Sequence, residues 1–124
     1  MIDFENASFK KLTEWDADKA REDLQDLLVP DEVVQLAFKG VRDSVTFTSR
    51  RIIAINTQGM TGKKKDMTSL PYGKVQAFSI ETAGTFDLES ELELWFSSLG
   101  RVRLEFGRGV DIRGVSRVLG EHVL

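Results

Sequence analysis

Hydrophobic and polar residues alternate along most of this chain from about residue 33 onward, at the two-residue period of half-buried β-strands. Near the C-terminus, for example, Leu92, Leu94 and Phe96 alternate with two glutamates and a tryptophan. Turns that contain glycine or proline separate the alternating runs. The pattern predicts seven short antiparallel strands, at residues 33–39, 44–48, 50–56, 63–70, 75–82, 91–96 and 101–106.

The two ends of the chain show helical spacing instead. The N-terminal stripe consists of Ala17, Ala20, Leu24, Leu27 and Leu28. Thr13 or Asp16 can cap the start of this helix, and Pro30 predicts that it ends at about Leu28. The C-terminal stripe starts after Asp111, a good N-cap, and consists of Ile112, Val115, Val118, Leu119 and Val123. We expect this second helix to cover one open end of the sheet.

These elements predict a mainly β fold with a helix at each end: a small curved sheet or partly open barrel. The length of 124 residues fits one hydrophobic core, and no apolar run approaches the roughly 20 residues of a membrane-spanning helix. We divide the chain into an acidic helical extension at residues 1–31 and a β domain at residues 32–124.

Charge is distributed unevenly along the chain. Residues 1–32 hold 4 Lys or Arg against 10 Asp or Glu, whereas residues 33–124 hold 13 against 10. The acidic segment is either a solvated helix or a cover for the mildly basic body. The sequence contains no cysteine, and its N-terminus lacks the long apolar segment of a secretory signal, so a cytoplasmic location is expected.

Several sequence pieces occur in an order typical of one known family: FTSRRIIAI, QGMTGKK, SLPYGKV, FSIETAG and ELELWFS. From about residue 33 to residue 124 the chain resembles the bacterial pleckstrin-homology-like (PH-like) family of small stand-alone proteins. The resemblance implies a seven-stranded antiparallel split barrel of two nearly orthogonal sheets, capped by a C-terminal helix. It also implies no enzyme activity and no cofactor, and several members of that family assemble into cyclic homo-oligomers.

The densest positive charge is at Lys63, Lys64 and Lys65, which follow the turn at Gly59 and Gly62. These lysines are candidates for binding an anion or a phospholipid headgroup. Because successive strand residues point to opposite faces, no more than two of them can converge on one phosphate. The alternative interpretation is a solvated edge strand that its lysines protect from aggregation. Around the first hairpin, the usual place for such cations in PH domains, the chain offers only Lys39 and Arg42, with Asp43 beside them.

A second candidate surface is an interface between subunits. The alternation places Trp95 outward, where it can pack under the N-terminal helix, against Arg101 or Arg103, or in an interface. Ile52 and Ile53 belong to a run that is apolar on both faces, so both faces need a cover. A second copy of the chain could supply that cover, which is the sequence argument for self-association.

Catalytic and metal sites are not predicted. The single histidine, His122, has no second histidine or cysteine to share a metal and no visible orienting partner. Glu91 and Glu93 point the same way, as residues on an exposed sheet face do. The glycine spacings fit neither a P-loop nor a dinucleotide fingerprint. The acidic balance, and the lack of a basic stripe interleaved with aromatic residues, argue against nucleic acid.

Two functions remain. The first is a non-enzymatic module that self-associates, forming a homo-oligomer that presents a surface to an unknown protein partner. The second is a peripheral module that binds an anion or phospholipid through residues 63–65. Burial of Trp95 and the isoleucine strand in an interface would favour the first, and convergence of lysines at one end of the barrel would favour the second.

Overall fold

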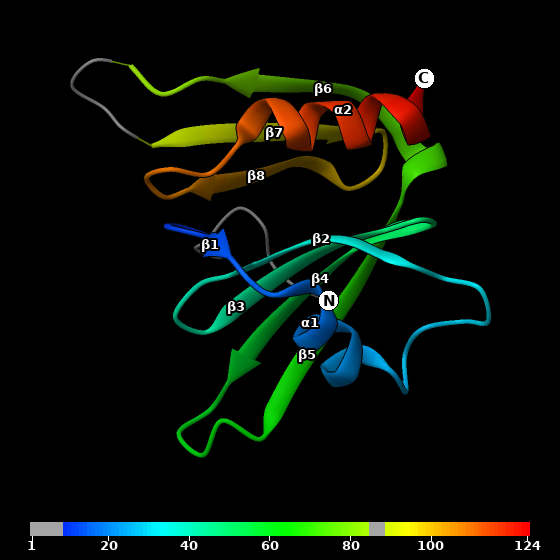
Figure 1. Ribbon diagram of the computed structural model, residues 1–124, viewed down its shortest axis with the longest axis vertical. Coiled ribbons are helices and arrows are strands. Elements are labelled where there is room, and N and C mark those ends of the chain that lie inside the picture. The colour runs from blue at the N-terminus through cyan, green and yellow to red at the C-terminus, as the bar shows by residue number, and fades with distance from the viewer. Residues whose placement is uncertain (1–8, 85–88) are drawn as a thin grey trace.

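The computed structural model describes residues 9–84 and 89–124, and these form two antiparallel sheets and two helices (Figure 1). The helices are α1 (Ala17–Leu24) and α2 (Ile112–Val123), and η1 (Tyr72–Lys74) is a single 3-10 turn. The strands are β1 (Thr13–Glu14), β2 (Val34–Lys39), β3 (Asp43–Thr48), β4 (Arg51–Gln58), β5 (Lys64–Pro71), β6 (Val75–Glu81), β7 (Ser90–Phe96) and β8 (Gly100–Phe106).

The first sheet is a meander in the order β1-β2-β3-β4-β5. Its strands from β2 to β5 are the first four predicted from the alternation, and the two-residue β1 is an addition that the sequence did not predict. β1 pairs with the end of β2, where Thr13 lies opposite Lys39. Positive φ angles at Gly59 and Gly62 allow the tight turn from β4 to β5, because glycine adopts this conformation without steric penalty.

The second sheet has the order β6-β7-β8. Along β7 and β8, side chains directed into the core alternate strictly with side chains directed outward. Leu92 and Leu94 of β7 lie opposite Leu104 and Val102 of β8, and all four are buried. We call the side of each sheet that faces the other sheet its inner face, and the opposite side its outer face. The inner faces carry the apolar residues of the main core, as the alternation predicted.

Residues 9–12 join the two sheets along one side of the barrel. The amide of Glu105 donates to the carbonyl of Phe9 at 2.8 Å, and the amide of Leu12 donates to the carbonyl of Glu105 at 3.1 Å. Phe9 and Leu12 are both buried in the main core. Part of the predicted N-terminal extension is therefore a structural component of the barrel, while its residues 1–8 lie outside the described part of the chain. The boundary at residues 31 and 32 stays a prediction.

On the other side the barrel is split. β5 is the last strand of the first sheet and β6 is the first strand of the second, and the chain passes from one to the other through η1. In Figure 1 the two sheets lie one above the other, with the green segment at η1 connecting them at one side. Helix α2 starts at its N-cap Asp111, as predicted, and adds Ile112, Val115 and Leu119 to the core.

Helix α1 lies on the outer face of the first sheet. Its Leu24 packs with Ile53 and Ile55 of β4 in a second, smaller hydrophobic cluster, which Leu27 and Leu28 extend. Asp16 caps the helix, as predicted, but the helix ends at Leu24 and not at about Leu28. The residues after Leu24 form a turn whose Leu27 carbonyl accepts a hydrogen bond from Arg51, so the sheet competes for this segment.

The predicted fold class, mainly β in two antiparallel sheets with a C-terminal helix, is confirmed. Neither described helix has the length and apolar character needed to cross a bilayer.

Candidate functional site

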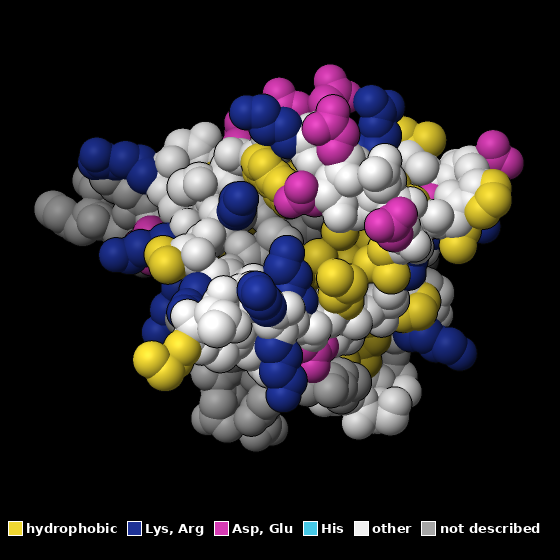
Figure 2. Space-filling model, turned by 90° about the horizontal axis from the view of Figure 1, so that it is seen from below, with side chains coloured by type: hydrophobic (Ala, Val, Ile, Leu, Met, Phe, Trp, Pro, Cys, Tyr) yellow, Lys and Arg dark blue, Asp and Glu magenta, His cyan; other side chains and the backbone are white. Residues whose placement is uncertain are grey.

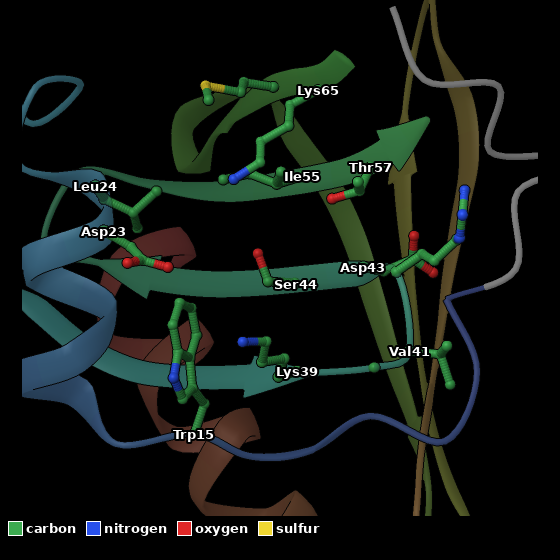
Figure 3. Close-up of a pocket in the computed structure, with 13 residues that line it drawn as sticks. Trp15, Asp23, Leu24, Lys39, Val41, Asp43, Ser44, Ile55, Thr57 and Lys65 are labelled. Atoms are coloured by element: carbon green, nitrogen blue, oxygen red, sulfur yellow. The ribbon is translucent and has the colours of Figure 1, made fainter. Parts of the chain in front are cut away.

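A groove of about 330 Å³ opens on the outer face of the first sheet, beside α1 (Figure 3). Residues of α1, of the β2–β3 hairpin and of strands β4 and β5 line it. In Figure 3 the Lys39 and Trp15 side chains lie on one side of Ser44, Lys65 lies on the other, and Asp23 reaches in from the helix. The floor of the groove is the sheet itself, and α1 forms one wall.

Three cationic side chains line this groove, and they come from two segments, the β2–β3 hairpin and strand β5: Lys39, Arg42 and Lys65. Lys39 is the last residue of β2, and its Nζ lies 4.8 Å from the centre of the Trp15 ring, a cation–π contact. Arg42 is in the β2–β3 turn, and its Nη1 donates to the carbonyl of Gly59 at 3.2 Å. The groove therefore combines two cations of the β2–β3 hairpin with Lys65 of β5, which is distant from them in sequence.

Two carboxylates, Asp23 and Asp43, share the groove with these cations. Burial raises the pKa of Asp43, and a hydrogen bond from the Asn56 amide opposes that rise. The groove thus offers hydrogen-bond acceptors as well as positive charge. It suits an anionic group whose other end carries hydroxyl or ammonium donors.

Only one of the three predicted lysines lines the groove. Lys65 lies opposite Thr57 and reaches into it, whereas Lys64 lies opposite Gln58 and its side chain alternates to the other face of the strand. Lys63 is in the turn before β5. Seen from below, Lys and Arg side chains are most numerous over the left and lower part of the surface, and others lie among the Asp and Glu side chains at the top and at the right margin (Figure 2).

Sequence reasoning treated Lys39 and Arg42 as too few cations for a site, because it could not place Lys65 beside them. It also missed Trp15. A register argument that paired Thr57 with Lys65 across the β4–β5 turn would have put Lys65 on the same face as Ile55, and this was the available signal.

The wall formed by α1 is held by a buried ion pair between Glu32 and Arg51. Arg51 donates from Nε and Nη2 to the two carboxylate oxygens at 2.9 Å each, and a second hydrogen bond from its Nη2 reaches the carbonyl of Leu27 at 2.8 Å. Thr48 Oγ1 donates to Glu32 at 2.6 Å, and the amide of Val29 donates at 3.1 Å. This network fixes the segment that follows α1 to the end of β3 and the start of β4.

The candidate interface residues lie on the outer face of the second sheet. Trp95 is 41% exposed, and the guanidinium carbon of Arg101 lies 5.7 Å from the centre of its ring. Arg101 also pairs with Glu93 at 3.8 Å, and Arg103 pairs with Glu91. These ion pairs join β7 to β8 across the outer face of the sheet. The sequence allowed Trp95 to pack under the N-terminal helix, against an arginine or in an interface, and the described residues show the contact with Arg101.

The two isoleucines have a different environment. Ile52 and Ile53 are both 0% exposed, Ile52 in the main core and Ile53 under α1. The inference that this strand needs a second copy to cover its other face does not hold, because Leu24 of the same chain covers it. These residues are inaccessible in the single chain, so a candidate interface is reduced to Trp95, Arg101 and Arg103.

His122 has structural partners that the sequence did not reveal. Its ring stacks on Tyr72 with 4.5 Å between ring centres, and its Nε2 lies 2.8 Å from Oε1 of Gln35. Tyr72 in turn donates to the carbonyl of Thr48 at 2.7 Å, and burial together with the charge of Glu32 raises the pKa of the Tyr72 hydroxyl. These contacts attach the end of α2 to η1 and β2.

Acidic residues meet in a small cleft at the far end of the second sheet, where Glu81, Glu89, Glu91 and Glu105 lie around Arg103. Within residues 9–84 and 89–124, no group of three or more histidine or acidic side chains has an arrangement that could hold a metal ion. The arginine and the sheet pairing account for this cluster.

Comparison with known families gives one match over nearly the whole chain, to the family described as bacterial PH domain, across residues 3–123. Two Bacillus subtilis proteins, both described as uncharacterized, are similar in sequence. YjqA is 44% identical over 101 residues, which is 80% of this chain and 81% of YjqA. YozO is 36% identical over 100 residues, which is 81% of this chain and 86% of YozO.

Solved structures agree. A protein with a pleckstrin-homology domain from Shewanella loihica superposes with a TM-score of 0.83 at 34% identity, over 93% of this chain and 99% of that one. A pleckstrin homology domain from Shewanella amazonensis gives a TM-score of 0.71 at 42% identity, over 96% and 93%. The expected PH-like fold is confirmed by these structures.

Proposed function

Because this chain belongs to the bacterial PH domain family, we propose that it is a non-enzymatic binding module whose basic groove captures a phosphate-bearing ligand. The observation that carries the proposal is that Lys39, Arg42 and Lys65 line one groove. From the sequence, lysines that converge at one end of the barrel are expected to favour anion capture over self-association, and Lys65 is the one of the three predicted lysines that lines this groove. The other discriminating feature, an isoleucine strand left for an interface, is lost because α1 covers that strand.

The chemistry of the groove narrows the ligand class. Three exposed cations can donate charge-assisted hydrogen bonds to a phosphate, and Asp23 and Asp43 can accept from hydroxyl or ammonium groups attached to it. A phosphate ester with a small polar head, either free or as a lipid headgroup, has this combination. Trp15 provides a flat apolar wall beside the cations.

The decisive experiment compares Lys65→Gln with Lys64→Gln. Both changes remove one positive charge from the same strand, but only Lys65 lines the groove. Binding is measured to vesicles of phosphatidylglycerol in phosphatidylcholine, by co-sedimentation, and to glycerol phosphate, by calorimetry. We expect Lys65→Gln to weaken binding about tenfold, since one charge-assisted hydrogen bond is lost, and Lys64→Gln to have little effect.

Binding to vesicles but not to glycerol phosphate would assign the lipid surface as the source of the phosphate, and the reverse would assign a free ester. Equal losses in the two variants would indicate nonspecific attraction between charged surfaces and would contradict the groove. No binding to either probe by the unchanged chain would also contradict it.

Self-association is the second candidate function, supported by one observation. Trp95 and Arg101 form a partly exposed aromatic and cationic pair on a sheet face that neither α1 nor α2 covers. Tryptophan and arginine are enriched in the energetically important parts of interfaces. A homo-oligomer formed through this face would leave the groove on the opposite sheet open to a ligand or a protein partner.

Native mass spectrometry over a range of protein concentrations tests this second candidate. A discrete multiple of 14.0 kDa that Trp95→Ala abolishes supports it. A monomer at all concentrations contradicts it without affecting the groove.

The absence of enzyme activity and a cytoplasmic location are parts of the same proposal. The one histidine of the chain supports the first, since its ring is held by Tyr72 and Gln35. The sequence without cysteine is compatible with a reducing compartment.

A further inference from the structure

The split between the two sheets leaves β5 as an edge strand. In an antiparallel ladder, the residues of a strand bond alternately to the neighbour on one side and to the neighbour on the other. The backbone amide of Thr57 donates to the carbonyl of Arg42. Thr57 and every second residue before it in β4 therefore form their backbone hydrogen bonds with β3. The other residues of β4 form theirs with β5. On β5, the residues that pair with this second set are Lys64, Asp66, Thr68 and Leu70.

The remaining residues of β5 therefore direct their backbone N–H and C=O groups away from the sheet: Lys65, Met67 and Ser69. Pro71, which follows in the same alternation, has no N–H and ends the row. Within the described residues, β4 is the one strand that pairs with β5. A row of free backbone groups of this kind is a template on which another extended segment can add.

A cleft of about 380 Å³ lies beside the C-terminal half of this edge. Leu70 and Pro71 line it from β5, and across the split Phe96 lines it from the end of β7 and Leu99 from the β7–β8 connection. Leu70 and Phe96 also belong to the main core, so the cleft is on the inner side of the sheet. An added strand would direct every second side chain to that side, and one of them would enter the cleft.

The N-terminal half of the same edge is basic. Lys63, Lys64 and Lys65 are all exposed there. A segment that pairs with β5 in antiparallel fashion has its C-terminal end beside these lysines and its N-terminal end beside the cleft. Charge complementarity then requires acidic residues at the C-terminal end of the segment and an apolar residue at its N-terminal end.

We propose that the free edge of β5 binds an extended segment of a partner protein by strand addition, with an apolar side chain in the cleft and acidic side chains beside the lysines. The lysines disfavour nonspecific pairing of this edge, as edge lysines do. They also select for an acidic partner, so edge protection and recognition use the same residues. The backbone edge and the cleft of this surface are separate from the groove, but the side chain of Lys65, which lines the groove together with that of Met67, belongs to both surfaces.

The test uses a fluorescein-labelled synthetic peptide as long as β5, in which leucine alternates with threonine in the first half and with glutamate in the second half. Fluorescence anisotropy measures its affinity for the full chain. Ser69→Pro removes an outward N–H that β4 does not use, and proline is tolerated on edge strands in this orientation. The matched control, Ser69→Ala, keeps the N–H. We expect Ser69→Pro to weaken binding about tenfold relative to Ser69→Ala.

A second variant keeps the inference testable if Ser69→Pro does not fold. Leu99→Gln makes the cleft polar without altering the strand edge, and we expect it to weaken binding severalfold. A peptide with lysine in place of glutamate should bind much more weakly to the unchanged chain. Equal affinity of Ser69→Pro and Ser69→Ala, or of the acidic and basic peptides, would overturn the proposal. Affinity that falls as the chain concentration rises would overturn it too, by showing that a second copy occupies the edge.

Discussion

The apolar side chains on the outer faces of the two sheets are shielded from solvent in different ways. In the first sheet the outer face carries Ile53 and Ile55, and the chain covers them with α1 and its Leu24. In the second sheet the outer face carries glutamates, arginines and Trp95, and the only described cover of that tryptophan is the side chain of Arg101. A helix therefore covers the apolar residues of the first outer face, whereas charged side chains of the sheet itself surround the tryptophan of the second.

This difference locates the two kinds of binding surface. A groove with walls forms where a helix lies on a sheet, because α1 covers only part of the first sheet and leaves a space beside it. Within the described residues the second sheet has no such helix on its outer face, which presents a charged patch around Trp95. Capture of a small ligand suits the first face, and contact with another protein surface suits the second.

The largest expected effect comes from removing the ion pair that holds α1 in place. Arg51→Ala leaves the Glu32 carboxylate buried without its cation, and we expect the free energy of unfolding to fall by about 4 kcal/mol. Arg50→Ala, the exposed neighbour, should change it by less than about 0.5 kcal/mol. Urea unfolding followed by tryptophan fluorescence measures both. Similar values for the two variants would show that the first face does not depend on this network.

Acid should weaken the same network. Burial by itself raises the pKa of Glu32, but hydrogen bonds from Arg51, Thr48 and the Val29 amide, together with the charge of Arg51, lower it to about 2. Because this pKa is depressed below the ordinary value of 4.5, the stabilisation is complete above pH 4.5 and is lost as the pH falls toward 2. We expect a loss of about 3 kcal/mol across that window.

The contribution of the Glu32 carboxylate is separated from that of other titrating groups by measuring the free energy of unfolding at several pH values, in the native chain and in the Glu32→Gln variant. Asp43 acts in the opposite direction, since its pKa is raised in the folded chain, so its contribution is present in acid and lost as the pH rises through that pKa. If the free energy of unfolding of Glu32→Gln falls with acid as steeply as that of the native chain, groups other than Glu32 cause the loss.

Truncation of the helix cover should cost less than loss of the ion pair. Leu24→Ala removes the buried side chain that packs on Ile53, and we expect a loss of about 2 kcal/mol in the free energy of unfolding. Because Leu24 also lines the groove, the variant should bind the phosphate probe more weakly as well. Unchanged stability would mean that the outer face of β4 is covered by something other than α1.

The smallest effect on stability is expected for Trp95→Ala. The side chain is 41% exposed and its ring contacts the partly exposed Arg101, so we expect a loss of less than about 1 kcal/mol. A loss as large as that of Leu24→Ala would erase the distinction between a covered and an open face. The same two variants can be compared by thermal unfolding, which requires little protein.

Much of the fold could be predicted from the sequence. The strands from β2 to β8 occur where the alternation indicated them, and Asp16 and Asp111 cap the two helices. Such signals are local, since a cap or an alternating run is contained within a few residues. The early end of α1 and the short β1 were missed, because hydrogen bonds from β4 and β2 decide them.

The sequence by itself determined which residues face inward on each strand, and therefore that Trp95 points away from the core and that only some of the three lysines share a face. Only the tertiary structure decided what lies opposite each outward residue. It placed Lys65 in the same groove as Lys39 and Arg42, and it placed Leu24 over Ile53. The physical reason is that alternation is a property of one strand, whereas a groove is formed by segments whose separation in sequence carries no information about their distance in space.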